Sequence, residues 1–231
     1  MLALSNVDSY YGRSHILHNL SLQADKAQIL AVLGRNGVGK TSLLRTIMGL
    51  TDRAEGAVTL DGQDISKALT HERARAGIGY VPQGRQIIPD FSIRENILMG
   101  GFAANGQGRK IPEIVPELFP YLMENLDRPG GVLSGGQQQQ LAIARALAAH
   151  PKVLLMDEPT EGIQPNIVEQ IEGCIVRLNR ELGLTIILVE QNVRFARDAA
   201  HAFAMIENGR SVAAGPIDAL SDDLVAKHMT I

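Results

Sequence analysis

Four short stretches of the chain are made up largely of apolar residues: 29–33, 78–81, 153–156 and 184–189. They lack the strict alternation of apolar and polar residues that marks a strand with one face in water. Continuous apolar runs of this length are typical of strands buried on both faces, as in a parallel sheet. The pattern therefore predicts an α/β fold with a parallel sheet at its centre.

Shorter strands are predicted near both ends of the chain. Residues 1–7 and 20–24 suit strands, the second with apolar and polar residues in alternation, and residues 57–60 lead into the tight turn Asp61-Gly62. Residues 202–206 and 211–214 flank Asn208-Gly209, which is the turn signature of a β-hairpin. We therefore expect strands before the first apolar run and a hairpin after the last.

Helical spacing is clearest in the last third of the chain. Apolar residues recur there every three or four positions, as on one face of an amphipathic helix. They are Ile167, Ile171, Ile175, Leu178 and Leu182. Shorter helices are predicted for residues 70–76, 138–149 and the tail 216–231.

Residues 84–136 differ in composition from the rest. Ser92-x-x-Glu95 is a capping box that predicts a helix start, and Gly100-Gly101 predicts its end. The glycine-rich residues 105–110 predict a mobile loop, and three prolines interrupt the next stretch. We expect one domain of residues 1–231, with a core formed by residues 1–83 and 137–231 and an inserted helical lobe of residues 84–136.

The first apolar run leads directly into the sequence GRNGVGKT, which has the spacing G-x-x-x-x-G-K-[ST] of a phosphate-binding loop. Such a loop turns its backbone N–H groups toward a phosphate chain, and the following helix adds its positive end. We expect Lys40 to reach the β- and γ-phosphates and the Thr41 hydroxyl to bind Mg²⁺. The predicted nucleotide-binding residues here are Gly34, Asn36, Gly37, Gly39, Lys40, Thr41 and Ser42.

Two carboxylates, Asp157 and Glu158, follow the apolar run 153–156. The carboxyl ends of parallel strands are where such sheets place ligands. Asp157 suits a Mg²⁺ ligand, and Glu158 suits a base that orients or deprotonates water. Gln83 follows the apolar run 78–81 and could reach a metal or water at the same edge, although solvated loop glutamines are common.

A glycine pair precedes the helix predicted from residue 138. Ser134 is a suitable N-cap, and Gly135 and Gly136 leave bare backbone N–H groups at the positive end of the helix, which favours an anion. A helix cap without an anion-binding role would not require two consecutive glycines, so the pair favours the anion site. Upstream, Tyr10 and Tyr11 lie in a chain with few aromatic residues, and they either stack on a base or pack against the sheet.

Composition excludes several classes of protein. The chain has 231 residues, a net charge of −3 and a pI of about 6.1, without the basic excess of a general nucleic-acid binder. No apolar run approaches the roughly 18 residues of a membrane span. The first residues are too few for a signal peptide, and the single Cys174 excludes an internal disulfide, so we expect a cytoplasmic location. No pair among the six histidines has metal-ligand spacing.

Together these motifs resemble the ATP-binding subunit of ABC transporters. Residues 34–41 match Walker A, residues 153–157 match Walker B, Gln83 matches the Q-loop, and residues 133–137 (LSGGQ) match the family signature. The resemblance implies a P-loop ABC ATPase core with an antiparallel β subdomain and an inserted helical subdomain. It also implies an ATPase that uses ATP and Mg²⁺, and it favours Tyr11 as the residue that stacks on adenine.

The family arrangement implies further roles. Two such domains pair head to tail, so Ser134, Gly135, Gly136 and Gln137 would bind a nucleotide held by the partner chain. The implied metal residues are Thr41, Asp157 and Gln83. The implied catalytic residues are Glu158, Lys40, Gln83 and Gln191, with Gln191 at the position of the usual switch histidine.

Two departures from the family pattern point to a subfamily. Gln191 replaces the switch histidine, and Gln164 stands where many members have aspartate. Both resemble the branched-chain amino acid importer subfamily, whereas the exact sequences of residues 34–41, 82–85, 137–140 and 157–165 resemble the urea transporter branch. The expected function is therefore the ATPase subunit of a small-solute importer, with urea as the expected solute and a branched-chain amino acid as the alternative. A soluble, non-transport ABC ATPase is a further alternative.

The resemblance also implies partners. They are a second ABC ATPase subunit, two transmembrane permease subunits, and a periplasmic or extracellular solute-binding protein, with this chain at the cytoplasmic face of the membrane. Residues 84–102 resemble the surface that contacts the permease. Its apolar residues would either form a docking groove or fill the core of the lobe; they are Ile87, Ile88, Phe91 and Ile93.

Overall fold

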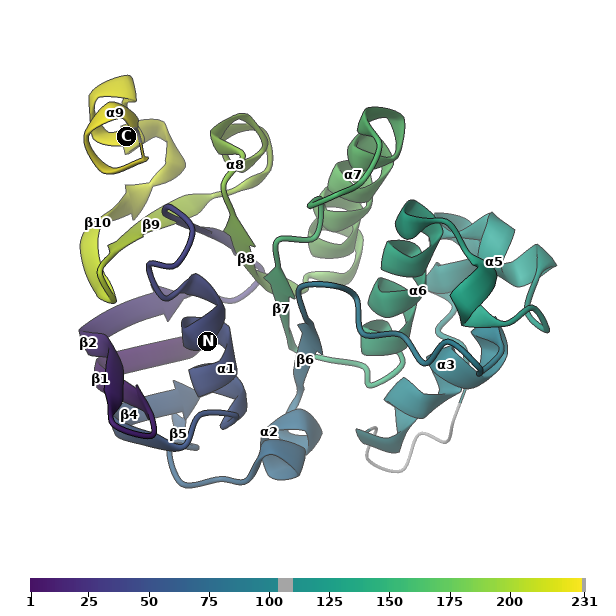
Figure 1. Cartoon of the computed structure of the whole chain (residues 1–231), viewed down its shortest axis with the longest axis horizontal. Helices are drawn as coiled ribbons and strands as arrows, with labels where there is room; N and C mark the ends of the chain where they lie inside the picture. Colours follow the sequence, from purple (N-terminus) through teal and green to yellow (C-terminus); the bar gives the residue numbers. More distant parts are fainter. Residues whose placement is uncertain (104–109, 230–231) are drawn as a thin grey trace.

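The computed structural model describes residues 1–103 and 110–229, and its strands form two sheets (Figure 1). The first sheet is antiparallel, with the order β2-β1-β4-β5. The second is mixed, with the order β10-β9-β3-β8-β7-β6. The strands are β1 Leu2–Tyr11, β2 Ser14–Ala24, β3 Ile29–Leu33, β4 Arg53–Leu60, β5 Gln63–Asp64, β6 Ile78–Val81, β7 Val153–Asp157, β8 Thr185–Glu190, β9 Ala202–Glu207 and β10 Arg210–Pro216.

The four central apolar runs are the parallel strands β3, β8, β7 and β6, as the sequence predicts. They are buried on both faces, and alternate residues enter two different cores. In β3, Ile29, Ala31 and Leu33 pack in one core, whereas Leu30 and Val32 pack in the other. The apolar runs therefore lack alternation because neither face of this sheet meets water.

Helices cover the mixed sheet on one face, and α1 with the antiparallel sheet covers the other. The helices are α1 Lys40–Met48, α2 Thr70–Ala76, α3 Ile93–Gly100, α4 Ile114–Leu118, α5 Pro120–Glu124, α6 Gly135–Leu147, α7 Pro165–Leu182, α8 Val193–Ala199 and α9 Asp222–Met229. Short 3₁₀ turns occur at Gly101–Ala103, Gly130–Val132 and Ile217–Ala219. In the part of the chain described here, no helix is long and apolar enough to cross a membrane.

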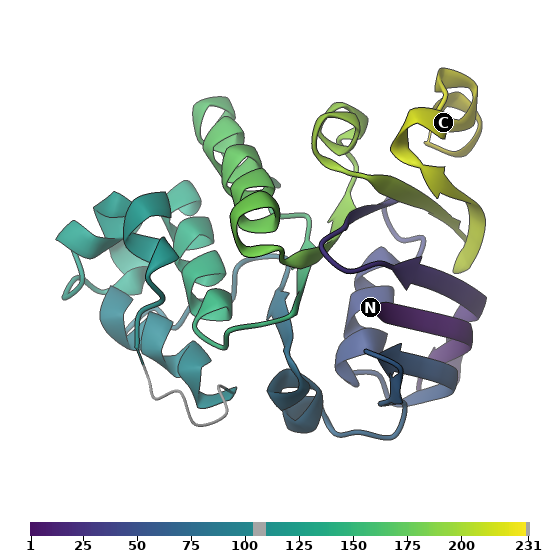
Figure 2. The ribbon, with the colours of Figure 1, turned by 180° about the vertical axis from the view of Figure 1, so that it is seen from behind.

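The helical lobe lies at the opposite side of the molecule from the antiparallel sheet (Figures 1 and 2). It contains α3, α4, α5 and α6. Helix α6 packs against α3 of the lobe and also contacts β6 and α7 of the core. Helix α6 therefore belongs structurally to both the core and the lobe. The division between them at residue 136 remains a prediction.

Several predicted elements have different bounds in the structure. Strand β1 extends to Tyr11, so both tyrosines lie in a strand and not in a loop. Helix α6 begins at Gly135, directly after the cap Ser134. Pro116 lies within α4, where it is tolerated because first-turn N–H groups have no helical partner. Most of the predicted loop 105–110 lies outside the described residues.

A buried arginine fixes the end of α1. Arg73 is 3% exposed, and its guanidinium donates to four backbone carbonyls at 2.7–2.9 Å, those of Thr46, Ile47, Ser66 and Ala68. Two of these carbonyls end α1, so the positive charge also meets the negative end of that helix. Burial lowers the pKa of Arg73 from its ordinary value. The side chain thereby holds α1 against the segment that leads into α2.

Replacing this guanidinium should destabilise the fold. We expect Arg73→Met to lower the free energy of unfolding by about 3 kcal/mol, because four buried carbonyls lose a charged donor. The control Arg180→Met removes an arginine whose side chain is 73% exposed, and it should change stability by less than about 0.5 kcal/mol. Urea denaturation of both variants measures the difference, and equal midpoints would contradict the role given to Arg73.

Candidate nucleotide-binding site

Most of the predicted site residues gather where the parallel strands end. Strand β8 lies between β3 and β7, and in its register Leu33 pairs with Glu190 and Asp157 with Val189. The phosphate loop after β3 and the carboxylates at the end of β7 therefore lie at the same level. A cavity of about 370 Å³ opens there. It is lined by Ile16, Asn36, Gly37, Gly39, Lys40, Thr41, Ser42, Gln83 and Glu158.

The phosphate loop has the backbone that its glycines allow. Gly37 and Gly39 have φ values of 78° and 108°, in the region that favours glycine. A side chain on Gly34 would lie 2.5 Å from the carbonyl oxygen of Ile206 in β9. Helix α1 begins at Lys40, directly after the loop, so its N-terminal N–H groups point into the cavity region. The loop is shaped for anion binding.

Lys40 is only 4% exposed and contacts three oxygen atoms. Its Nζ donates to the carbonyl oxygens of Gly34 at 2.8 Å and Arg35 at 2.9 Å. It also lies 3.2 Å from Oε1 of Glu158, whose side chain is 8% exposed. A buried ammonium needs such partners, because an unpaired one would lose its hydration without compensation. The contact with Glu158 joins the phosphate loop to the end of β7.

Asp157 lies between the loop and the sheet. Its Oδ1 accepts from the Thr41 hydroxyl at 3.1 Å, and its Oδ2 accepts from the Tyr80 hydroxyl at 3.4 Å. Burial, together with the charge of Glu158, raises the pKa of Asp157. Burial and the neighbouring Asp157 raise the pKa of Tyr80 to about 12, so its hydroxyl remains a donor. A buried carboxylate disfavoured by its surroundings is an environment that a cation would stabilise.

Glu158 has a left-handed backbone conformation, with φ of 46°. Its N–H donates to the carbonyl of Val189 at 3.0 Å, which holds the residue against the end of β8. Its Oε1 accepts from Nε2 of Gln191 at 2.9 Å. The structure therefore brings Gln191 to the carboxylate of Glu158, a contact that the sequence did not predict.

Glu190 anchors the two loops that flank Glu158. It is 4% exposed, its Oε1 accepts from the Thr160 hydroxyl at 2.8 Å, and its Oε2 accepts from the N–H groups of Gln191 and Asn192. Burial raises the pKa of Glu190. Neither Glu190 nor Thr160 was among the predicted site residues. The only feature of the sequence that could have indicated Glu190 is its position as an acidic residue at the end of a buried strand.

Of two further predicted residues, one lines the cavity and one does not. Gln83 lines the cavity, and its Nε2 donates to Oε2 of Glu161 at 2.8 Å. Tyr11 does not line it; a hydrogen bond with Tyr11 is the main cause that raises the pKa of Arg45 in α1. Ile16, which sequence reasoning missed, does line the cavity. Its apolar side chain in β2 carried no recognisable signal.

The glycine pair of residues 135–136 lies outside this cavity. Ser134 caps α6, since its hydroxyl accepts from the Gln137 N–H while the Gln137 side chain accepts from the Ser134 N–H. A side chain on Gly136 would lie 2.4 Å from Cγ2 of Ile167 in α7. Close packing of α6 on α7 is therefore one reason for this glycine, in addition to any anion-binding role.

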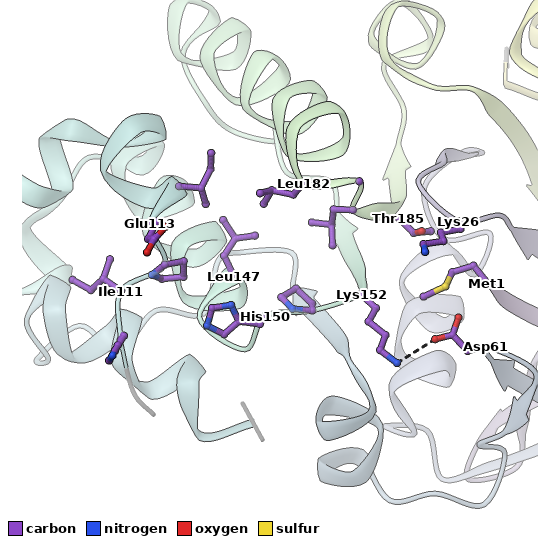
Figure 3. Close-up of a pocket in the computed structure, with 16 residues that line it drawn as sticks. Met1, Lys26, Asp61, Ile111, Glu113, Leu147, His150, Lys152, Leu182 and Thr185 are labelled. Carbon is purple, nitrogen blue, oxygen red and sulfur yellow. Dashed lines mark hydrogen bonds and ion pairs between the residues drawn. The ribbon is translucent and has the colours of Figure 1, made fainter. Parts of the chain in front are cut away.

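A second cavity, of about 820 Å³, lies at the opposite edge of the sheet, where β7 and β8 begin (Figure 3). Lys152, Leu184 and Thr185 line it on the strand side, and Lys152 pairs with Asp61 at 3.2 Å. Ile111 and Glu113 line it on the side of the lobe. It is larger than the cavity at the phosphate loop, but it lies at the amino ends of the strands, away from the predicted chemistry.

Comparisons with known proteins agree with this geometry. Residues 17–161 match the family model described as ABC transporter. The chain is 39% identical to the high-affinity branched-chain amino acid transport ATP-binding protein BraG of Pseudomonas aeruginosa, over 92% of this chain and 91% of that one. It is 35% identical to the probable branched-chain amino acid transport ATP-binding protein LivF of Archaeoglobus fulgidus, over 91% of this chain and 89% of that one.

Solved structures show the same fold. A dimeric structure of the ATP-binding cassette MJ0796 bound to ADP and Pi superimposes with a TM-score of 0.82 at 27% identity, over 94% of this chain and 99% of that one. The predicted fold, a P-loop core with an antiparallel sheet and a helical subdomain, is confirmed. The phosphate loop, the paired carboxylates and the family match lead to one conclusion: the chain belongs to the ABC transporter family and is an ATP-binding ATPase.

Proposed function

We propose that the chain hydrolyses ATP with Mg²⁺ at the cavity beside Lys40 and couples this reaction to import of a branched-chain amino acid. The observation that carries the reaction is the linked set of contacts among Lys40, Glu158 and Gln191. Nearly all of the predicted phosphate-binding residues line the same cavity as Glu158. A carboxylate at this place can orient a water molecule toward a phosphate held by the loop.

Lys40 is arranged to exchange partners. Its ammonium donates to two loop carbonyls and contacts Glu158, and the oxygens of β- and γ-phosphates would replace these partners when ATP binds. This exchange would release the Glu158 carboxylate from the ammonium. The carboxylate would then accept a proton from the attacking water.

The residues at Asp157 fit Mg²⁺. The Thr41 hydroxyl oxygen and Asp157 Oδ1 lie 3.1 Å apart, and both are hard oxygen ligands of the kind that Mg²⁺ prefers. Bound Mg²⁺ would neutralise charge on the phosphates. Gln83, on the same cavity wall, would contact the ion or its water through its side-chain oxygen. Its amide nitrogen would then remain on Glu161.

Gln191 is proposed to position Glu158. Its amide donates to the carboxylate, and the buried Glu190 accepts from its N–H at 3.1 Å, which fixes the backbone at this point. An amide carries no proton charge, so its contribution is that of one hydrogen bond. This is a smaller role than that of a base.

Two variants separate these roles. Glu158→Gln should bind ATP and lose at least about a thousandfold in turnover, since the group that activates water is removed. Gln191→Ala should cost about 1–3 kcal/mol of transition-state stabilisation, the value of one hydrogen bond to a charged group. Phosphate release and ATP binding, measured in the assembled transporter, provide the comparison. Equal losses in the two variants would contradict the smaller role of Gln191.

A complete site is proposed to need two ATPase subunits. Ser134, Gly135, Gly136 and Gln137 lie on the lobe, outside the cavity that holds the phosphate loop. The similar cassette MJ0796 forms a dimer in its solved structure. In a head-to-tail pair, the capped start of α6 would face the nucleotide of the other subunit with its N–H groups.

Blocking the start of α6 tests this arrangement. Ser134→Arg should lower ATPase activity by at least about tenfold and leave ATP binding to the isolated chain unchanged, because the side chain would enter the partner's site. The control Ser211→Arg adds the same charge at an exposed position on β10. ATPase activity that is high, and independent of protein concentration in dilute solution, would exclude the two-subunit site.

The permease is proposed to contact residues 84–102. Asn96 is buried and its side chain bonds the backbone of Ile88, Phe91 and Ser92 at 2.8–3.1 Å, which fixes this loop. Phe91 is 37% exposed, whereas Ile93 lies in the core. Only part of the predicted apolar groove is therefore available at the surface.

The solute is proposed from similarity along the whole chain. BraG and LivF are named as branched-chain amino acid transport proteins, and each matches more than nine tenths of this chain. The expectation of urea depends on the exact sequence of four short stretches, residues 34–41, 82–85, 137–140 and 157–165, which lie in or beside the predicted ATP sites. Similarity that includes the permease-facing lobe is better evidence for the solute, so the amino acid is preferred.

Uptake assays decide between the two solutes. Deleting the gene should lower high-affinity uptake of labelled leucine at least about tenfold and leave labelled urea uptake unchanged, because the proposed ATPase would power import of the amino acid and not of urea. Complementation with the native gene should restore uptake, whereas the Glu158→Gln gene should not. A selective loss of urea uptake would reverse the assignment.

A further inference from the structure

Three side chains with metal-ligating atoms meet on the β1–β2 hairpin. Asp8, His15 and His18 each offer one such atom, and these atoms lie within 4.8 Å of one another. We propose that these three residues form a binding site for a divalent transition metal ion of the zinc class. The sequence analysis found no histidine pair with metal-ligand spacing, because the contact between His15 and His18 depends on the irregular register of β2. The third ligand, Asp8, comes from the neighbouring strand β1.

Two register shifts between β1 and β2 bring the two histidines to one face. Val7 pairs with Leu20 and Ser9 pairs with Leu17, so Asp8 lies opposite two residues, His18 and Asn19. Asn19 has a φ of 50°, as expected for the extra residue of a bulge. Tyr10 then pairs with His15, so Ile16 is a second extra residue on β2. Leu17 and Leu20 both face the core, whereas His15 and His18 lie on the side of Asp8.

The ligating groups are held in place by their neighbours. Oδ1 of Asp8 accepts from the Asn19 N–H at 3.1 Å and lies 2.6 Å from Nε2 of His15. The His15 ring stacks on Tyr10 with centroids 4.3 Å apart, and it lies 3.9 Å from the ring of His18. Such outer contacts orient metal ligands and lower the cost of assembling them.

The His18 backbone is also fixed. Its N–H donates to the carbonyl of Gly209, in the turn between β9 and β10, at 2.9 Å. A side chain on Gly209 would lie 2.9 Å from Cδ2 of His18, so the turn and the imidazole are in close packing. The site is therefore supported by both sheets.

Metal binding requires a neutral imidazole and an ionised carboxylate. The positive charge of Arg210 acts on His18 and would also repel a cation. We therefore expect weaker binding than at a four-ligand structural site.

The ligand set selects the ion. Two imidazoles and a carboxylate suit Zn²⁺ and similar ions, whereas Mg²⁺ prefers oxygen ligands throughout. Three protein ligands leave one position for water, which fits the 35% exposure of the His15 side chain. The site shares no ligand with the proposed Mg²⁺ position at Thr41 and Asp157. It adjoins the nucleotide cavity through Ile16, which lies between the two histidines in sequence.

Calorimetric titration with ZnCl₂ tests the proposal, using tag-free chain stripped of metal and kept in excess MgCl₂ without nucleotide. The expected result is one Zn²⁺ per chain. His15→Ala and His18→Ala should each weaken binding at least about tenfold, as loss of one of three ligands requires. His71→Ala and His150→Ala remove histidines elsewhere on the chain and should bind Zn²⁺ as the native chain does.

Three outcomes would overturn the proposal. They are no zinc binding by the native chain, binding by His15→Ala equal to that of the native chain, or loss of binding in the controls. His15 is an exposed residue, so His15→Ala keeps the test valid even if His18→Ala disturbs packing. In the first two outcomes, Asp8 and His15 would be a surface ion pair only.

Discussion

The ion pair between Lys40 and Glu158 joins the two parts of the sequence on which the site depends. The two side chains are 4% and 8% exposed, and their charged atoms lie 3.2 Å apart. A buried pair of this kind is weak evidence for stability, since removing two charges from water offsets much of their attraction. Its importance is positional: it places the carboxylate proposed to orient water beside the ammonium proposed to bind phosphate.

The register of the sheet makes this pair possible. Strands β3 and β7 both pair with β8, so the phosphate loop and the two carboxylates leave the sheet at the same edge although more than a hundred residues separate them. The strands are buried on both faces, by α1 and the antiparallel sheet on one side and by helices on the other. The edge is rigid because two cores support it.

Irregular segments of the molecule are fixed by buried polar side chains. Arg73 binds four carbonyls near the end of α1, and Asn96 binds the loop before α3. Glu190 binds the segment after β7 through Thr160 and the segment after β8 through Gln191. Each is less than a tenth exposed and hydrogen-bonded to the backbone or to a loop hydroxyl. Loops lack the regular hydrogen bonds of helices and strands, so such side chains replace them.

The sequence by itself determined the local chemistry of this protein. The phosphate loop, the apolar strand that ends in Asp157 and Glu158, and the cap Ser134 are short segments whose conformation follows from neighbouring residues, and the structure has them where the sequence predicts. The inserted helices 84–136 were also recognisable, because prolines, glycines and a capping box mark helix ends locally.

Only the tertiary structure decided which distant residues meet. Gln191 on Glu158, Thr160 on Glu190, and Asp8 beside His15 and His18 are contacts between different segments, and no local pattern encodes them. The last depends on two register shifts between β1 and β2, each of which shifts the side-chain alternation by one residue and leaves no signal in the apolar pattern. Strand pairing and register set these contacts, since they are properties of the whole fold.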